Sequence, residues 1–82
     1  MKNYTGTAWM FILITRKSKI TERVVTTYYN DYLSTHEDEM IGTAIGICIG
    51  ARQYVKSVAV NVYRCTYDNG NIKERRLIRR QQ

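Results

Sequence analysis

The feature that most constrains this fold is a regular alternation that ends in an Asn-Gly turn. Residues 55–67 read VKSVAVNVYRCTY, with valines at every second position from Val58 to Val62, which is the period of a β-strand. The sequence DNGN follows at 68–71, and Asn-Gly between such segments is a strong hairpin signal. These features predict strands at about 55–67 and 72–80. The predicted pairs are Tyr67 with Ile72, Tyr63 with Arg76, and Val62 with Leu77.

A second hairpin is predicted near the N-terminus. Residues 7–15 read TAWMFILIT, a run too short and too rich in bulky side chains for a surface helix, so we expect a strand buried on both faces. The polar residues RKSK come next, and 20–29 then reads ITERVVTTYY, rich in the β-branched and aromatic residues that favour strands. The two segments therefore predict an antiparallel pair.

The segment between the hairpins predicts a helix at about 35–52. Ser34 stands three residues before Glu37, the spacing of a capping box, and the acidic residues at 37–39 favour the positive end of the helix dipole. The body MIGTAIGICIGA also alternates as a strand does, so a strand is the alternative. Wound as a helix, it carries Ile45 and Ile49 on its broad apolar arc. On the opposite side lie Gly42, Gly46 and Gly50.

The order of elements predicts an α+β fold, a single ββαββ domain covering residues 1–82. A chain of 82 residues suits one domain with a thin core. The first and third strands are apolar, whereas the second and fourth carry the charges that protect sheet edges from aggregation. We therefore predict a four-stranded antiparallel sheet in the order 2-1-3-4, with the helix packed on one face.

Catalytic chemistry finds few suitable residues. His36 is the one histidine and stands beside acidic residues, but successive helical side chains point in different directions and cannot converge on a metal. The glycines of the helix lack the lysine-serine or lysine-threonine ending of a phosphate loop. Cys48 and Cys65 have no metal or redox spacing, and we interpret them as buried thiols in a reducing cytoplasm. We expect no catalytic residue, no metal and no cofactor, and no apolar run reaches the length that spans a membrane.

Positive charge predicts an anionic partner. The net charge is +6, and basic residues crowd both ends of the chain around an acidic centre; lysine and arginine beside phosphates release counterions, and aromatic rings stack on unpaired bases. The alternative is an edge strand charged for solubility, with Tyr63 covering Arg76, since no known nucleic-acid motif is present. The candidate nucleic-acid-binding residues are Tyr63, Tyr67, Arg75, Arg76, Arg79 and Arg80, with Arg16, Lys17 and Lys19 as a second patch.

A protein interface is the competing hypothesis. Each glycine inside a helix costs about 1 kcal/mol relative to alanine, so the glycine stripe has either a packing role against its own sheet or a role in a partner contact. One helix covers one sheet face, so either Trp9, Phe11 and Leu13 or else Met10, Ile12 and Ile14 need another cover. A homodimer would supply it. The candidate interface residues are Gly42, Gly46, Gly50, Trp9 and Phe11.

In length and in hairpin-helix-hairpin order, the chain resembles the small accessory proteins of phages and mobile elements. The resemblance implies nucleic-acid binding or the blocking of host defence proteins, and it rests on layout alone, so no family residue is carried over. We expect a non-enzymatic cytoplasmic module that binds nucleic acid through a basic sheet edge. The alternatives are a protein-protein module of the host-defence inhibitor type and a homo-oligomeric structural component.

Overall fold

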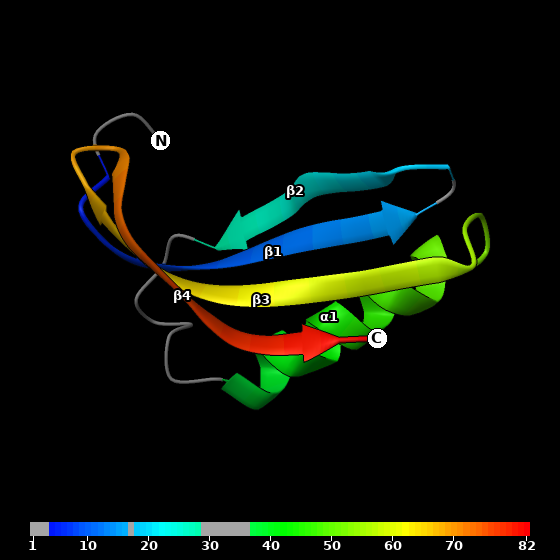
Figure 1. The fold of residues 1–82 in the computed structure, drawn as a ribbon. Coiled ribbons are helices and arrows are strands. Elements are labelled where there is room, and N and C mark those ends of the chain that lie inside the picture. The colour runs from blue at the N-terminus through cyan, green and yellow to red at the C-terminus, as the bar shows by residue number, and fades with distance from the viewer. Residues whose placement is uncertain (1–3, 17, 29–36) are drawn as a thin grey trace.

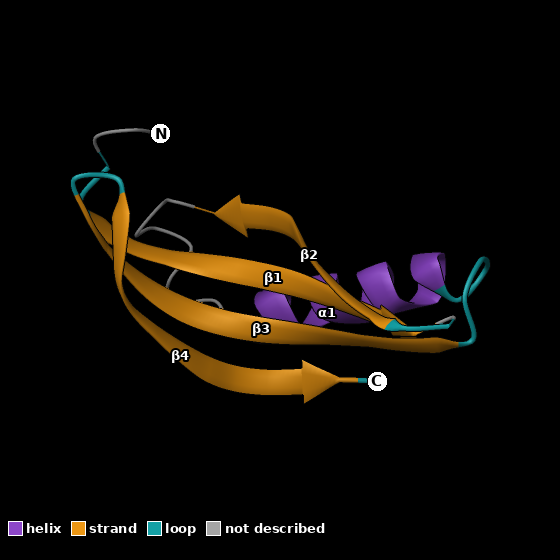
Figure 2. Ribbon diagram, turned by 45° about the horizontal axis from the view of Figure 1, so that its top comes forward, coloured by secondary structure: helices purple, strands orange, loops and turns teal. Residues whose placement is uncertain are grey.

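Four strands and one helix follow one another in the predicted order. In the computed structural model, which describes residues 4–16, 18–28 and 37–82, the elements are β1 (Gly6–Arg16), β2 (Ile20–Tyr28), α1 (Glu37–Ala51), β3 (Ser57–Asp68) and β4 (Asn71–Gln81). The strands form one antiparallel sheet in the order β2-β1-β3-β4, and α1 lies across one face of it (Figures 1 and 2). The predicted ββαββ fold and strand order are confirmed, and the ambiguous segment is a helix.

The β3–β4 hairpin turns where the sequence predicts. Asn69 has a φ of 52° and Gly70 a φ of 85°, the left-handed values that a two-residue type I′ turn requires at both central positions. The Gly70 amide also donates to the Tyr4 carbonyl at 2.8 Å. The turn is thereby fixed to the segment that leads into β1.

Beyond the turn, the register of β3 and β4 departs from the prediction. Tyr67 faces Ile72 as expected, but Tyr63 faces Leu77 and Val62 faces Arg79. The predicted pairs of Tyr63 with Arg76 and Val62 with Leu77 are therefore wrong. Two irregularities, one on each side of the Tyr63–Thr66 stretch of β3, each add one residue to β4, as β-bulges do.

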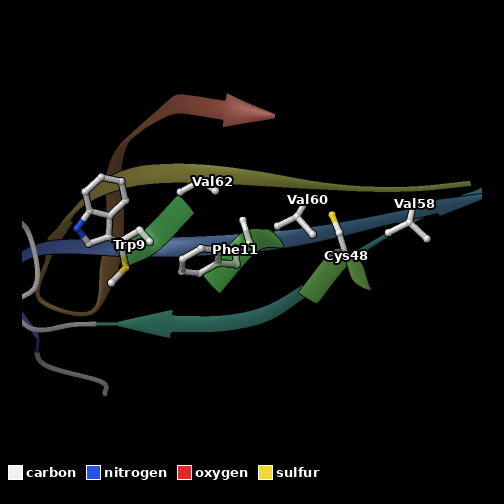
Figure 3. Close-up of a cluster of buried hydrophobic side chains, with 8 residues drawn as sticks. Trp9, Phe11, Cys48, Val58, Val60 and Val62 are labelled. Atoms are coloured by element: carbon white, nitrogen blue, oxygen red, sulfur yellow. The ribbon is translucent and has the colours of Figure 1, made fainter. Parts of the chain in front are cut away.

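The core lies between α1 and the sheet. Alternate side chains of β1 and β3 point toward the helix, as Figure 3 shows, and meet Met40, Ala44 and Cys48. Phe11 packs edge-on against Tyr28 of β2, with ring centroids 5.8 Å apart. Removing such apolar surface from water is the main force that holds the helix on the sheet. The buried members from the sheet are Trp9, Phe11, Val58, Val60 and Val62.

Trp9 and Phe11 consequently leave the set of interface candidates. Both are buried beneath α1, where a partner cannot reach them. The sequence predicts that one of two rows needs another cover, and the row formed by Met10, Ile12 and Ile14 is the one that faces away from α1. We call that side of the sheet the open face.

The open face carries its own apolar set. Tyr67 packs edge-on against Tyr4 at 6.0 Å between ring centroids, and these rings cover small neighbours at one end of β1 and β3. The buried residues on this side are Ala8, Met10, Ile12, Cys65 and Tyr67. Because α1 lies on the opposite side, no helix of the described part of the chain covers the open face.

α1 is apolar on most of its circumference. Its buried residues are Met40, Ala44 and Cys48, which lie on the broad apolar arc and away from the glycine stripe. Ile45 and Ile49, which the sequence places on the same arc, are 40% and 59% exposed, so only part of that arc is buried. The inner contact is narrower than the apolar arc because one helix touches a sheet along a single stripe.

The glycine stripe lies on the outer side of α1, as predicted. A Cβ atom added at Gly42, Gly46 or Gly50 would meet nothing within 4 Å. Close packing of the helix on its own sheet therefore does not account for these glycines.

Some expectations concern residues outside the described part. These are the capping box of Ser34 with Glu37, the helix start at 35, the end of the second strand at Tyr29, and the position of His36.

Candidate nucleic-acid interface

β4 presents basic side chains on both sides of the sheet. Arg75 and Arg80 lie opposite Cys65 and Asn61, on the open face, whereas Arg76 and Arg79 lie opposite Arg64 and Val62, on the side of α1. The irregularity between Thr66 and Tyr67 exchanges the faces of Arg75 and Arg76, since it turns Arg76 away from Tyr63. We call Lys73, Arg75, Arg76, Arg79 and Arg80 the basic edge.

The arginines of the basic edge have no carboxylate partner within the described part of the chain. Arg79 Nε donates to Gln81 Oε1 at 3.2 Å, and the Arg75 guanidinium lies 4.4 Å from the ring centroid of Tyr63. Arg76 directly faces Arg64, and like charges opposed across a strand pair are destabilising. The edge thus holds concentrated positive charge that the neighbouring residues leave uncompensated.

Only one of the two predicted stacking residues is placed to act. Tyr63 is half-buried, and its hydroxyl accepts a hydrogen bond from Asn61 Nδ2 at 3.2 Å. Its ring is covered by Arg75, a cation-π contact. Tyr67 is 5% exposed and packed against Tyr4, so a base cannot stack on its face.

The structure brings the second predicted patch next to the basic edge. Arg16 ends β1 opposite Ser57, and one strand separates β1 from β4, a distance of roughly 10 Å. Arg16 and Arg80 line a shared hollow of about 170 Å³. Lys19 is exposed in the turn after Arg16, and Lys17 lies outside the described residues. Arg16 and Lys19 extend the basic edge around one end of the sheet.

Arg64 is a candidate that the sequence reasoning missed. Its guanidinium lies 5.0 Å from the ring centroid of Trp9, and Nη2 donates to Thr7 Oγ1 at 2.6 Å. Arg64 Nη1 and Trp9 Nε1 are buried without a hydrogen-bond partner in the described structure, which costs free energy. The signal was the position of Arg64 in β3, two residues after Val62, which points into the core.

The two thiols behave as apolar residues. Both are free and buried, as predicted. Burial raises the pKa of the Cys48 thiol against the opposing charge of Arg52, and raises the pKa of the Cys65 thiol against Arg75 and Arg64. Cys48 Sγ donates to the Gln81 carbonyl at 3.4 Å. Each thiol therefore stays protonated and unreactive at neutral pH.

Comparison with known proteins gives no family for this chain. It matches no protein-family model, no curated protein and no solved structure. Among the described residues, no three His, Cys, Asp or Glu side chains are grouped closely enough to hold a metal ion. No helix in the described ranges has the length and apolar character needed to cross a membrane. The function is therefore inferred from the geometry of the chain's own residues.

Proposed function

We propose that this chain is a small non-enzymatic protein that binds nucleic acid along its basic edge. The observation that carries the proposal is the pair of Arg64 in β3 and Arg76 in β4, which face each other. The other arginines of β4 also have no carboxylate partner among the described residues. The head of Arg64 turns toward Trp9 and Thr7, so Arg76 is the one that a phosphate would contact. A phosphate beside Arg76 offsets the repulsion between the two arginines and releases condensed counterions.

The contacts favour backbone recognition over sequence recognition. Arginines on both sides of β4, joined at one end by Arg16 and Lys19, form a band that can follow a phosphate chain. The Arg75 guanidinium that covers the Tyr63 ring offers a planar cation, which can stack on any unpaired base. We therefore expect binding with little sequence preference, because phosphate contacts carry no sequence information. We place the protein in the cytoplasm, where two free thiols stay reduced.

A salt titration tests the proposal. Fluorescence anisotropy with labelled generic DNA and RNA would be recorded from about 50 to about 200 mM salt, a range over which several phosphate contacts lose orders of magnitude in affinity. Replacing Arg76 or Arg79 with alanine should each reduce the salt slope by about one. Arg23→Ala, measured with an oligonucleotide that fits one edge, is the matched control, since Arg23 is exposed on the opposite edge strand. An edge charged only for solubility predicts no binding, or equal effects of Arg23→Ala and Arg76→Ala, and either result would reject the proposal.

A protein partner on the open face is the second candidate. Four exposed apolar side chains surround the buried Met10 and Ile12 on this face, and they are Ile20, Val24, Ile72 and Leu77. Asn61 Oδ1 is also buried there without a partner in the described structure. Exposed apolar patches with a polar rim are typical of protein interfaces. This candidate requires a host protein that the chain captures even after nuclease treatment, and Leu77→Asp should abolish that capture. Capture that survives the substitution would contradict the candidate.

A further inference from the structure

α1 has the composition of a helix covered on every side. No charged residue occurs from Met40 to Ala51, and the outer side consists of the three open glycines with Ile45 and Ile49. A helix that is apolar all round is typically buried all round. In the single chain only its inner stripe is buried.

A groove on the same side of the sheet accompanies this uncovered helix. α1 packs mainly on β3, with less contact to β4 and β1. Four strands about 4.8 Å apart make a sheet roughly 19 Å wide, whereas one helix is about 10 Å across. The half of the sheet formed by β1 and β2 therefore borders a groove of about 690 Å³, which is lined by Leu13, Thr21 and Val25 from the strands and by Ile47, Gly50 and Ala51 from α1.

We propose that a second copy of this chain fills the groove with its own α1. The two helices lie side by side and antiparallel between two sheets, and each outer face packs on β1 and β2 of the other copy. A two-fold axis makes the contact self-complementary, as in most homodimers. The open glycines let the helices approach closely, and the exposed Ile45 and Ile49 enter the partner's groove.

Charge complementarity selects the antiparallel arrangement and a copy of the same chain. The first turn of α1 carries Glu37, Asp38 and Glu39, and the exposed Arg52 follows its last residue. With the axis beside Gly46, Glu39 lies seven residues before it and Arg52 six residues after it. Glu39 and the partner's Arg52 then differ by one residue along the helix, about 1.5 Å. Parallel helices would instead bring the two acidic ends together.

This dimer leaves the open face exposed, together with Arg75 and Arg80 of the basic edge, and its formation does not depend on nucleic-acid binding. Light scattering tests it through the mass of the particle. The unaltered chain should show twice the monomer mass at high concentration and dissociate on dilution. Gly46→Gln should give a monomer with unchanged helical circular dichroism, because a Cβ atom at this position meets nothing within 4 Å in the described structure. Ile72→Gln, which alters an exposed apolar residue of the far hairpin, is the matched control and should remain a dimer.

Charge reversal tests the orientation of the helices. Glu39→Arg or Arg52→Glu alone should raise the dissociation constant of the dimer roughly tenfold, since each places two like-charged pairs across the interface. The double reversal should restore it. A chain that is monomeric at every concentration, or a dimer indifferent to Gly46→Gln, would overturn the proposal and leave the groove to a foreign helix. A double reversal that fails to restore association would overturn the antiparallel arrangement.

Discussion

Replacing the outer glycines of α1 with alanine should stabilise the single chain. Gly42, Gly46 and Gly50 each lie inside or at the end of a helix, with nothing within 4 Å of an added Cβ. Glycine costs about 1 kcal/mol relative to alanine in a helix interior, and no clash opposes the gain here. Gly50 is close to the helix end, so its share is smaller, and the triple variant should gain about 2 kcal/mol. For a domain of this size, that corresponds to a rise in Tm of roughly 8 to 16 °C.

The assay is thermal or urea unfolding at dilutions where light scattering shows the mass of a monomer. Gly70→Ala is the internal control, because the same substitution at a φ of 85° forces alanine into the left-handed region and should destabilise the chain by more than about 1 kcal/mol. A gain in unfolding free energy at the helix glycines and a loss at Gly70 would follow from backbone conformation alone. Destabilisation by alanine at the helix sites under these conditions would mean that the outer face of α1 is already packed within one chain, and would refute this reasoning.

Two further predictions concern the core and the thiols. Phe11→Ala should lower the free energy of unfolding by about 3–5 kcal/mol, because Phe11 is fully buried against Tyr28. That is a large part of the stability of a small domain. Chemical denaturation measures the loss, and Leu77→Ala, at a half-exposed site, should show a far smaller one. Burial raises the pKa of Cys48 and Cys65 above the unfolded value, so their contribution to stability is full below about pH 8.5 and is lost as pH rises above it. Unfolding free energies should thus be level between about pH 6 and 8, and their alkaline decline should be shallower when both cysteines are alanine.

Local patterns were enough to predict the layers of this fold. The alternation of β3 and the Asn-Gly turn determine one hairpin, and the apolar character of β1 against the charge of β2 and β4 determines the strand order. These patterns predict the fold because burial and edge protection each select the type of side chain at individual positions of a strand. The fold class, the strand order and the buried cysteines followed from the sequence on this basis.

The faces of the basic edge could not be predicted in the same way. In KERRLIRR almost every position is charged. A register shifted by one residue would therefore place charged side chains on both faces again, and the sequence pattern cannot distinguish the two registers. The bulges depend on the twist that the sheet adopts, and they decide that Arg75, and not Arg76, covers Tyr63. A similar bulge in β2, between the partners of Phe11 and Ile12, leaves Val25 to line the groove beside α1.

The inward side of α1 was only partly predictable, for a related reason. A helix without charge in its body gives a broad apolar arc, and the width of the sheet contact selects Met40, Ala44 and Cys48 from it. Ile45 and Ile49 then remain outside. Uniform apolarity is thus poor evidence for orientation within one chain, but it is good evidence that a second surface covers the helix.

The two proposed surfaces have a joint consequence, because a two-fold dimer carries two basic edges. One long nucleic acid can then occupy both edges, and the second contact becomes intramolecular, which can raise the apparent affinity by roughly 100-fold or more without any new contact. Gly46→Gln changes no charge and lies on the outer side of α1. It should leave the affinity for an oligonucleotide that fits one edge unchanged, and it should weaken binding of a strand long enough to reach both. Equal affinities of the dimer for short and long strands would show that the two edges do not act on one polymer, even if each surface binds as proposed.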